Sequence, residues 1–134
     1  MEAERAIEHS MEVDDPLVRE WTSVLSGVID FRLGRVERAQ KTSLECIEAA
    51  SKKLEQDTSN FDLFDSTALS YCGLSLCGDP NAKMQAIEAF LKSRAIVSAS
   101  GIVDIVLLVL DALDTERLLP EVRRINRLDP QLQK

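Results

Sequence analysis

Apolar residues recur at the three- and four-residue spacing of amphipathic helices along most of this chain. The breaks between the periodic stretches carry glycine, proline or residues that cap helices. The pattern predicts six helices, over about residues 16–33, 36–54, 61–76, 83–97, 102–113 and 115–128. Short connections favour antiparallel neighbours, so these helices are expected to form three hairpins.

Two of the predicted helices carry unusual features. The stretch 102–113 is apolar nearly all round, which predicts a helix enclosed by its neighbours. Its Val and Ile residues also fit a buried strand, although twelve residues is long for one. In the last helix Asp114 is expected to be the cap, and Pro120 should either kink the helix or move its start downstream.

The two ends of the chain differ from the middle. Residues 1–15 contain six acidic residues and one arginine, and Ala3, Ile7 and Met11 share one face if this segment is helical. We therefore expect residues 1–15 to be either an acidic arm or a short amphipathic helix. Residues 16–130 are expected to be a single all-helical domain, and 131–134 a tail.

Small residues in the first predicted hairpin follow steps of seven, five and seven, at Gly27, Gly34, Ala39 and Cys46. This resembles the small-residue pattern of the tetratricopeptide repeat. The later hairpins add further parts of that pattern: Ala86, Phe90 and Ser93, then Leu118, Val122, Ile125 and the closing Leu128-Asp129-Pro130. The resemblance implies an all-α protein with three antiparallel hairpins stacked as a short solenoid. The alternative is a compact helical bundle.

Composition narrows the classes of partner. The chain has 134 residues, enough for one domain with its own core. Its net charge of -7 and 4% aromatic content argue against a nucleic-acid partner, which needs basic residues and stacking platforms. The most apolar run, 102–113, is far shorter than the ~20 residues that span a membrane. We therefore expect neither nucleic acid nor membrane as partner.

Few residues suit catalysis or ligand binding. The cysteines, Cys46, Cys72 and Cys77, are odd in number and have no paired spacing, which argues against a disulfide framework and favours a reducing compartment, the cytoplasm or the nucleus. His9 is the sole histidine, and no glycine-rich phosphate loop is present. The sequence predicts no enzyme, no metal and no cofactor.

The predicted function is a non-catalytic protein-interaction module, an adaptor or scaffold. In the arrangement implied by the resemblance, the first helix of each hairpin lines a concave apolar groove that binds an amphipathic or apolar segment. Seven residues are expected to line it: Trp21, Val24, Val28, Phe31, Val103, Leu107 and Leu110. A partner helix, a second copy of the chain or residues 1–15 are the possible occupants.

Two alternatives stay open at this point. The chain also fits a structural subunit, a bundle that dimerises or sits in a larger complex, with Trp21 and Phe31 as ordinary core residues. The arginines near the C-terminus fit either a solvated outer face of the last helix or a contact with an acidic partner; they are Arg117, Arg123, Arg124 and Arg127.

Overall fold

A computed structural model describes residues 16–97 and 99–127. This part of the chain is all-α, with no strand, which confirms the predicted fold class. The helices are α2 (Pro16–Arg32), α3 (Val36–Gln56), α4 (Phe61–Leu76), α5 (Ala82–Ile96), α6 (Ser100–Leu113) and α7 (Pro120–Arg127). The predictions for residues 1–15 and 131–134 lie outside the described residues.

Glycines end α2 and α4 as the sequence predicts. Gly34 has a φ of 78° and Gly78 a φ of 109°, a left-handed conformation that side chains with a Cβ rarely adopt. After α2, the Gly34 amide donates to the Phe31 carbonyl and the Arg35 amide to the Asp30 carbonyl, at 3.0 and 2.8 Å. These bonds satisfy carbonyls that the helix itself leaves without partners.

Pro120 moves the start of the last helix downstream rather than kinking it. It is the first residue of α7, where a missing N–H removes no helical hydrogen bond. The preceding loop is held by Asp114, whose carboxylate oxygens accept from the Leu118 and Leu119 amides at 2.8 Å each. Asp114 is the C-cap residue of α6, so the prediction that it caps the last helix is wrong, because that helix begins only at Pro120.

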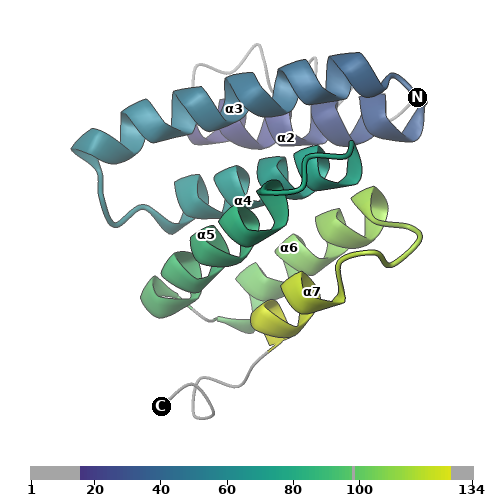
Figure 1. The fold of residues 1–134 in the computed structure, drawn as a ribbon. Coiled ribbons are helices and arrows are strands. Elements are labelled where there is room, and N and C mark those ends of the chain that lie inside the picture. The colour runs from purple at the N-terminus through teal and green to yellow at the C-terminus, as the bar shows by residue number, and fades with distance from the viewer. Residues whose placement is uncertain (1–15, 98, 128–134) are drawn as a thin grey trace.

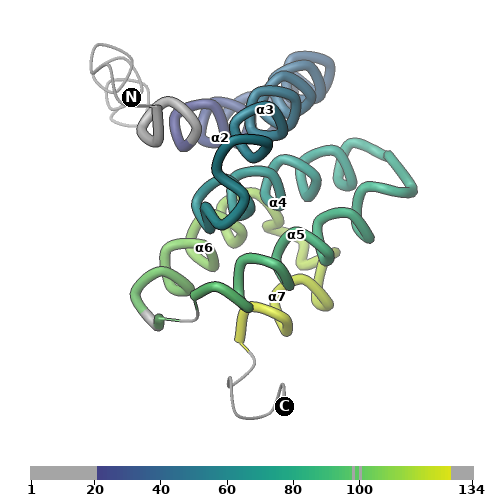
Figure 2. Tube along the Cα trace, turned by 90° about the vertical axis from the view of Figure 1, so that its left-hand side faces the viewer, coloured from purple at the N-terminus to yellow at the C-terminus, as the bar shows by residue number. Residues whose placement is uncertain are grey.

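Helix α4 lies at the centre of the fold. It contacts α2, α3, α5 and α6, while α5 and α6 both pack on α7. Figure 1 draws α2 behind α3, and Figure 2 shows α2 and α6 towards one side and α5 and α7 towards the other. The sequence of α4 allows this position because small residues such as Ser66, Ala68 and Gly73 let neighbouring helices approach from several directions.

Helices α2 and α6 come from the first and third hairpins and touch each other. Near their C-terminal ends, Arg32 Nη1 donates to the Ala112 carbonyl at 3.4 Å. The first helices of two hairpins that are far apart in sequence therefore meet directly. The apolar residues of α2 and α6 that face each other are buried as a result.

Two arginine–aspartate pairs are buried between helices. Arg94 of α5 places Nη2 2.6 Å from both carboxylate oxygens of Asp65 in α4. Arg123 of α7 donates from Nη1 to Asp114 Oδ2 and from Nη2 to the Asp114 carbonyl, each at 2.9 Å. Arg123 is only 4% exposed, so the interpretation of this arginine as part of a solvated outer face is wrong. The neighbouring Arg124 is exposed.

Small residues also fill the contact of α2 and α3 with α4. A Cβ added to Gly73 would lie 3.1 Å from Ser43 Oγ, and one added to Gly27 would lie 3.7 Å from the Thr42 methyl group. Ala39 is only 2% exposed in the same region. Larger side chains here would have to displace a neighbouring helix.

We expect Ala39→Leu to lower the free energy of unfolding by about 1–3 kcal/mol, because the extra carbons overpack this contact. Chemical denaturation followed by circular dichroism measures the change. Ala95→Leu is the matched control, since Ala95 is exposed on α5 and should tolerate leucine. Equal stability of the two variants would show that the helix contact at Ala39 accommodates a leucine side chain without overpacking.

Candidate functional site

The residues predicted to line a groove occupy mainly interior positions. Val24, Val28, Val103 and Leu110 are 9% exposed or less. Trp21 and Phe31 pack against the core cluster and are half-buried, as is Leu107. The expected open trough is therefore not formed by these seven residues, because α2 and α6 pack together and bury the side chains between them. The four buried side chains offer no surface to a partner in this conformation.

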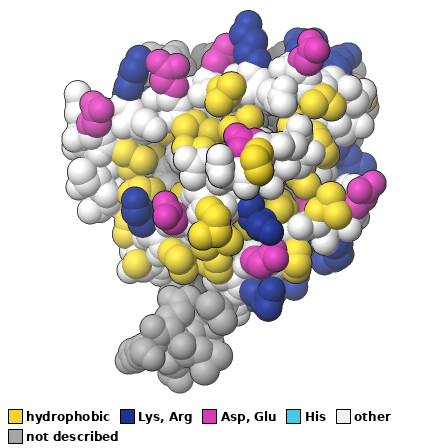
Figure 3. Space-filling view, in the orientation of Figure 1, with side chains coloured by type: hydrophobic (Ala, Val, Ile, Leu, Met, Phe, Trp, Pro, Cys, Tyr) yellow, Lys and Arg dark blue, Asp and Glu magenta, His cyan; other side chains and the backbone are white. Residues whose placement is uncertain are grey.

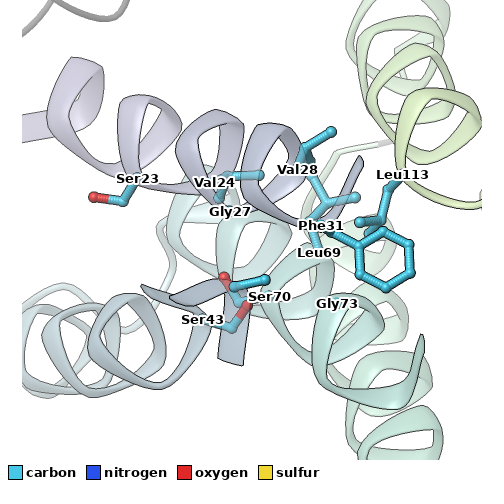
Figure 4. A pocket seen from close by; sticks show the side chains of 11 residues that line it. Ser23, Val24, Gly27, Val28, Phe31, Ser43, Leu69, Ser70, Gly73 and Leu113 are labelled. Atoms are coloured by element: carbon cyan, nitrogen blue, oxygen red, sulfur yellow. The ribbon is translucent and has the colours of Figure 1, made fainter. Parts of the chain in front are cut away.

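A small interior pocket, shown in Figure 4, lies between α2, α3 and α4, and α6 contributes Leu113 to it. Val24, Val28 and Phe31 from α2 meet Leu69 of α4 and Leu113 of α6 around it. Its volume is about 10 Å³, which is near the minimum for one water molecule. This pocket is a packing defect at a helix junction and is too small for a ligand.

A larger and more open groove lies between α3 and α5, on the face shown in Figure 3. Helices α3 and α5 both pack on α4, but they make no contact with each other in the described structure. A strip of α4 is therefore left uncovered between them. The groove has a volume of about 210 Å³, and its lining comes from three helices: Leu54, Phe64, Thr67, Tyr71, Gln85, Glu88, Ala89 and Lys92.

The floor of this groove follows the periodicity of α4. Phe64, Thr67 and Tyr71 stand at positions i, i+3 and i+7, so they share one face of the helix. Phe64 and Tyr71 are half-buried, so part of each ring reaches the surface. The floor therefore offers two partly exposed aromatic rings, with the buried Thr67 between them.

The polar groups of the groove are placed at its centre and along one wall. Thr67 is only 8% exposed, and its Oγ1 has no hydrogen-bond partner. Lys92 Nζ lies 6.0 Å from the centre of the Phe64 ring, within the range of a cation–π contact. Glu88 and Lys92 belong to the α5 wall and give it both signs of charge. The Thr67 oxygen itself is buried, so a partner here would meet an apolar floor and a charged wall.

The described residues hold little that suits catalysis. Burial raises the pKa of the Cys72 thiol, and burial also raises that of Cys77, so neither thiol is activated as a nucleophile. Within residues 16–97 and 99–127 no group of three or more His, Cys, Asp or Glu side chains is placed to hold a metal ion. No described helix combines the length and apolarity needed to cross a bilayer.

Sequence reasoning missed the groove because its residues look like an ordinary core stripe. Leu63, Phe64, Leu69 and Tyr71 are all apolar residues of one predicted helix, and nothing local separates those that face the core from those at its edge. The spacing of Phe64 and Tyr71 is the one local signal, since it puts two aromatic rings on the same face. Which face of α4 stays uncovered depends on where α3 and α5 pack.

Comparisons with protein-family models, with curated proteins and with solved structures found no match for this chain.

Proposed function

We propose that this chain is a non-catalytic protein-interaction module that binds an amphipathic segment in the groove between α3 and α5. The observation that carries the proposal is the uncovered strip of α4, with its two half-buried aromatic rings, Phe64 and Tyr71. These rings supply the apolar contact area that the apolar residues of such a segment would bury.

The dimensions of the groove favour a peptide segment over a small molecule. Its volume of about 210 Å³ is below the ~300–1,000 Å³ of typical ligand pockets. The distance from Phe64 to Tyr71 along α4 is about 10 Å, since a helix rises ~1.5 Å per residue. This length accommodates apolar side chains from two successive turns of a partner helix.

For the architecture, we infer a short stack of three helix hairpins related to the tetratricopeptide arrangement. The pairing of α2 with α3, of α4 with α5 and of α6 with α7 supports this inference. The α2–α6 contact favours a closed stack, intermediate between an open solenoid and the compact bundle. Three cysteines without disulfide bonds support a reducing compartment, the cytoplasm or the nucleus.

Filling the groove should weaken partner binding without unfolding the protein. Gln85 is exposed and lines the groove, so Gln85→Trp places a large side chain in it without touching the core. Binders are selected from a library of helical peptides, and partners are captured from native extract. We expect Gln85→Trp to weaken binding about tenfold or more, the effect of losing the burial of one large apolar side chain.

Met84→Trp is the matched control, because Met84 is the neighbouring residue, is exposed and does not line the groove. It should leave the same peptides bound. Peptides and partners that bind both variants like the wild type would show that the groove is not the binding site. A stable dimer in sedimentation, dissolved by Gln85→Trp, would favour the alternative function of a self-associating structural subunit.

A further inference from the structure

Helix α6 presents an apolar surface that no described element covers. Leu108 is 72% exposed and Ile105 is 54% exposed. The sequence predicts that this helix is enclosed by neighbours, and that prediction is wrong for this side. Its neighbours α2, α4 and α7 leave this arc of the helix open. Residues three apart are neighbours on a helix surface, so these two side chains form one continuous apolar area.

Acidic residues stand before and after these two apolar residues in the sequence, and on the helix surface they lie along one edge of them. Asp104 is exposed and stands one turn before Leu108, and Asp111 stands three residues after it. Asp111 accepts from Arg123 Nε at 3.1 Å, yet its side chain remains 44% exposed. The sequence of α6 contains no lysine or arginine. We call Asp104, Ile105, Leu108 and Asp111 the α6 patch.

Charge selects among the possible occupants. Residues 1–15 carry six acidic residues and one arginine, so they would bring like charge to the α6 patch. A second copy joined through the same patch would place aspartates of both copies at one interface, since a two-fold contact uses the same surface twice. A partner segment that carries lysine or arginine beside its apolar residues removes both conflicts.

We propose that the α6 patch is the docking site for a basic amphipathic helix of another protein. Its apolar residues bury Ile105 and Leu108, and its lysines or arginines face Asp104 and Asp111. The patch is separate from the groove between α3 and α5, so this proposal does not rest on the proposed function of that groove. A chain with both surfaces would join two partners.

The probe is a synthetic peptide of leucine and lysine about 15 residues long, with its leucines on one helix face, because shorter isolated helices are barely stable. A second peptide with glutamate in place of lysine tests the role of charge. The full chain is titrated with each peptide, and amide chemical shifts in NMR spectra locate the contact. We expect the lysine peptide to shift the amides of α6 and to bind about tenfold or more tightly than the glutamate peptide.

The variant Leu108→Lys should weaken binding of the lysine peptide about tenfold or more, because it removes an apolar contact and adds like charge. Met84→Lys is the matched control, since Met84 is a similarly exposed apolar residue on α5, and it should change nothing. Gln85→Trp should also leave this binding intact, which separates it from binding in the groove between α3 and α5.

Four results would overturn the proposal. They are equal binding of the two peptides, unchanged affinity in Leu108→Lys, shifts confined to other helices, and a dimer of the free chain that Leu108→Lys dissolves. The last result would assign the α6 patch to a second copy. Deletion of residues 1–12 gives one further test: tighter peptide binding by the shortened chain would show that its own N-terminal segment occupies the patch.

Discussion

Replacing Asp114 by alanine should lower the free energy of unfolding by about 3–5 kcal/mol, the usual cost of breaking a buried ion pair from one side. Asp114 accepts from Leu118, Leu119 and Arg123, and its side chain is 0% exposed. Without it, the buried Arg123 loses its closest carboxylate, and two amides of the loop lose their acceptor. Urea denaturation followed by circular dichroism measures the loss.

Asp111→Ala is the matched control for this variant. Asp111 also pairs with Arg123, at 3.1 Å, but its side chain is 44% exposed. Exposed ion pairs contribute about 0–1 kcal/mol, so this variant should stay close to the wild type. Similar losses in the free energy of unfolding of the two variants would contradict this expectation. They would show that Arg123 is stabilised by the summed negative charge around it and not by its hydrogen bonds to Asp114.

Replacing Arg94 by methionine should also cost about 3–5 kcal/mol, because Asp65 is 0% exposed and would lose the cation beside it. The Arg94–Asp65 pair leaves more hydrogen-bond donors unsatisfied than the Arg123–Asp114 pair does. Arg94 uses Nη2 towards Asp65 and Ser93, while its Nε and Nη1 are buried and have no hydrogen-bond partner. Burying polar groups without partners is costly, so the Arg94–Asp65 pair gives little net stability.

The double variant Arg94→Met with Asp65→Leu should therefore recover most of the stability that the single variant loses. Thermal and urea unfolding of both variants test this expectation. A double variant as unstable as Arg94→Met alone would show that the pair contributes stability of its own. The corresponding exchange at Arg123 and Asp114 should not recover stability, since Asp114 also holds the loop amides.

The loss caused by Arg94→Met should depend on pH. Burial raises the pKa of Asp65 above its ordinary value of 3.8, and Arg94 lowers it, so removing Arg94 raises it further. Between 3.8 and that raised pKa, the folded state holds more protons than the unfolded state. The deficit of the variant relative to the wild type should therefore shrink as the pH falls from the Asp65 pKa of the variant to the lower Asp65 pKa of the wild type. A deficit independent of pH would show that Asp65 is already protonated at neutral pH.

The six helices and most of their ends can be predicted from the sequence alone. Apolar periodicity locates all six, because a helix facing a core repeats its apolar positions whatever it packs against. Gly34 and Pro120 act through their own backbone chemistry, a positive φ and a missing N–H, and both mark ends where the structure has them. Such signals are local, so they need no knowledge of the neighbouring helices.

Which side of each helix is covered depends on how the helices pack in three dimensions. Val24 and Leu110 belong to the core and not to a groove, because α2 and α6 contact each other. Phe64 and Tyr71 form the floor of a groove, because α3 and α5 do not contact each other. The same packing of the helices buries Arg123 beside Asp114 and leaves Leu108 exposed. Apolar periodicity predicts which side chains favour burial. Whether each of them is buried depends on the packing of helices that are distant in sequence, and that packing involves the whole chain.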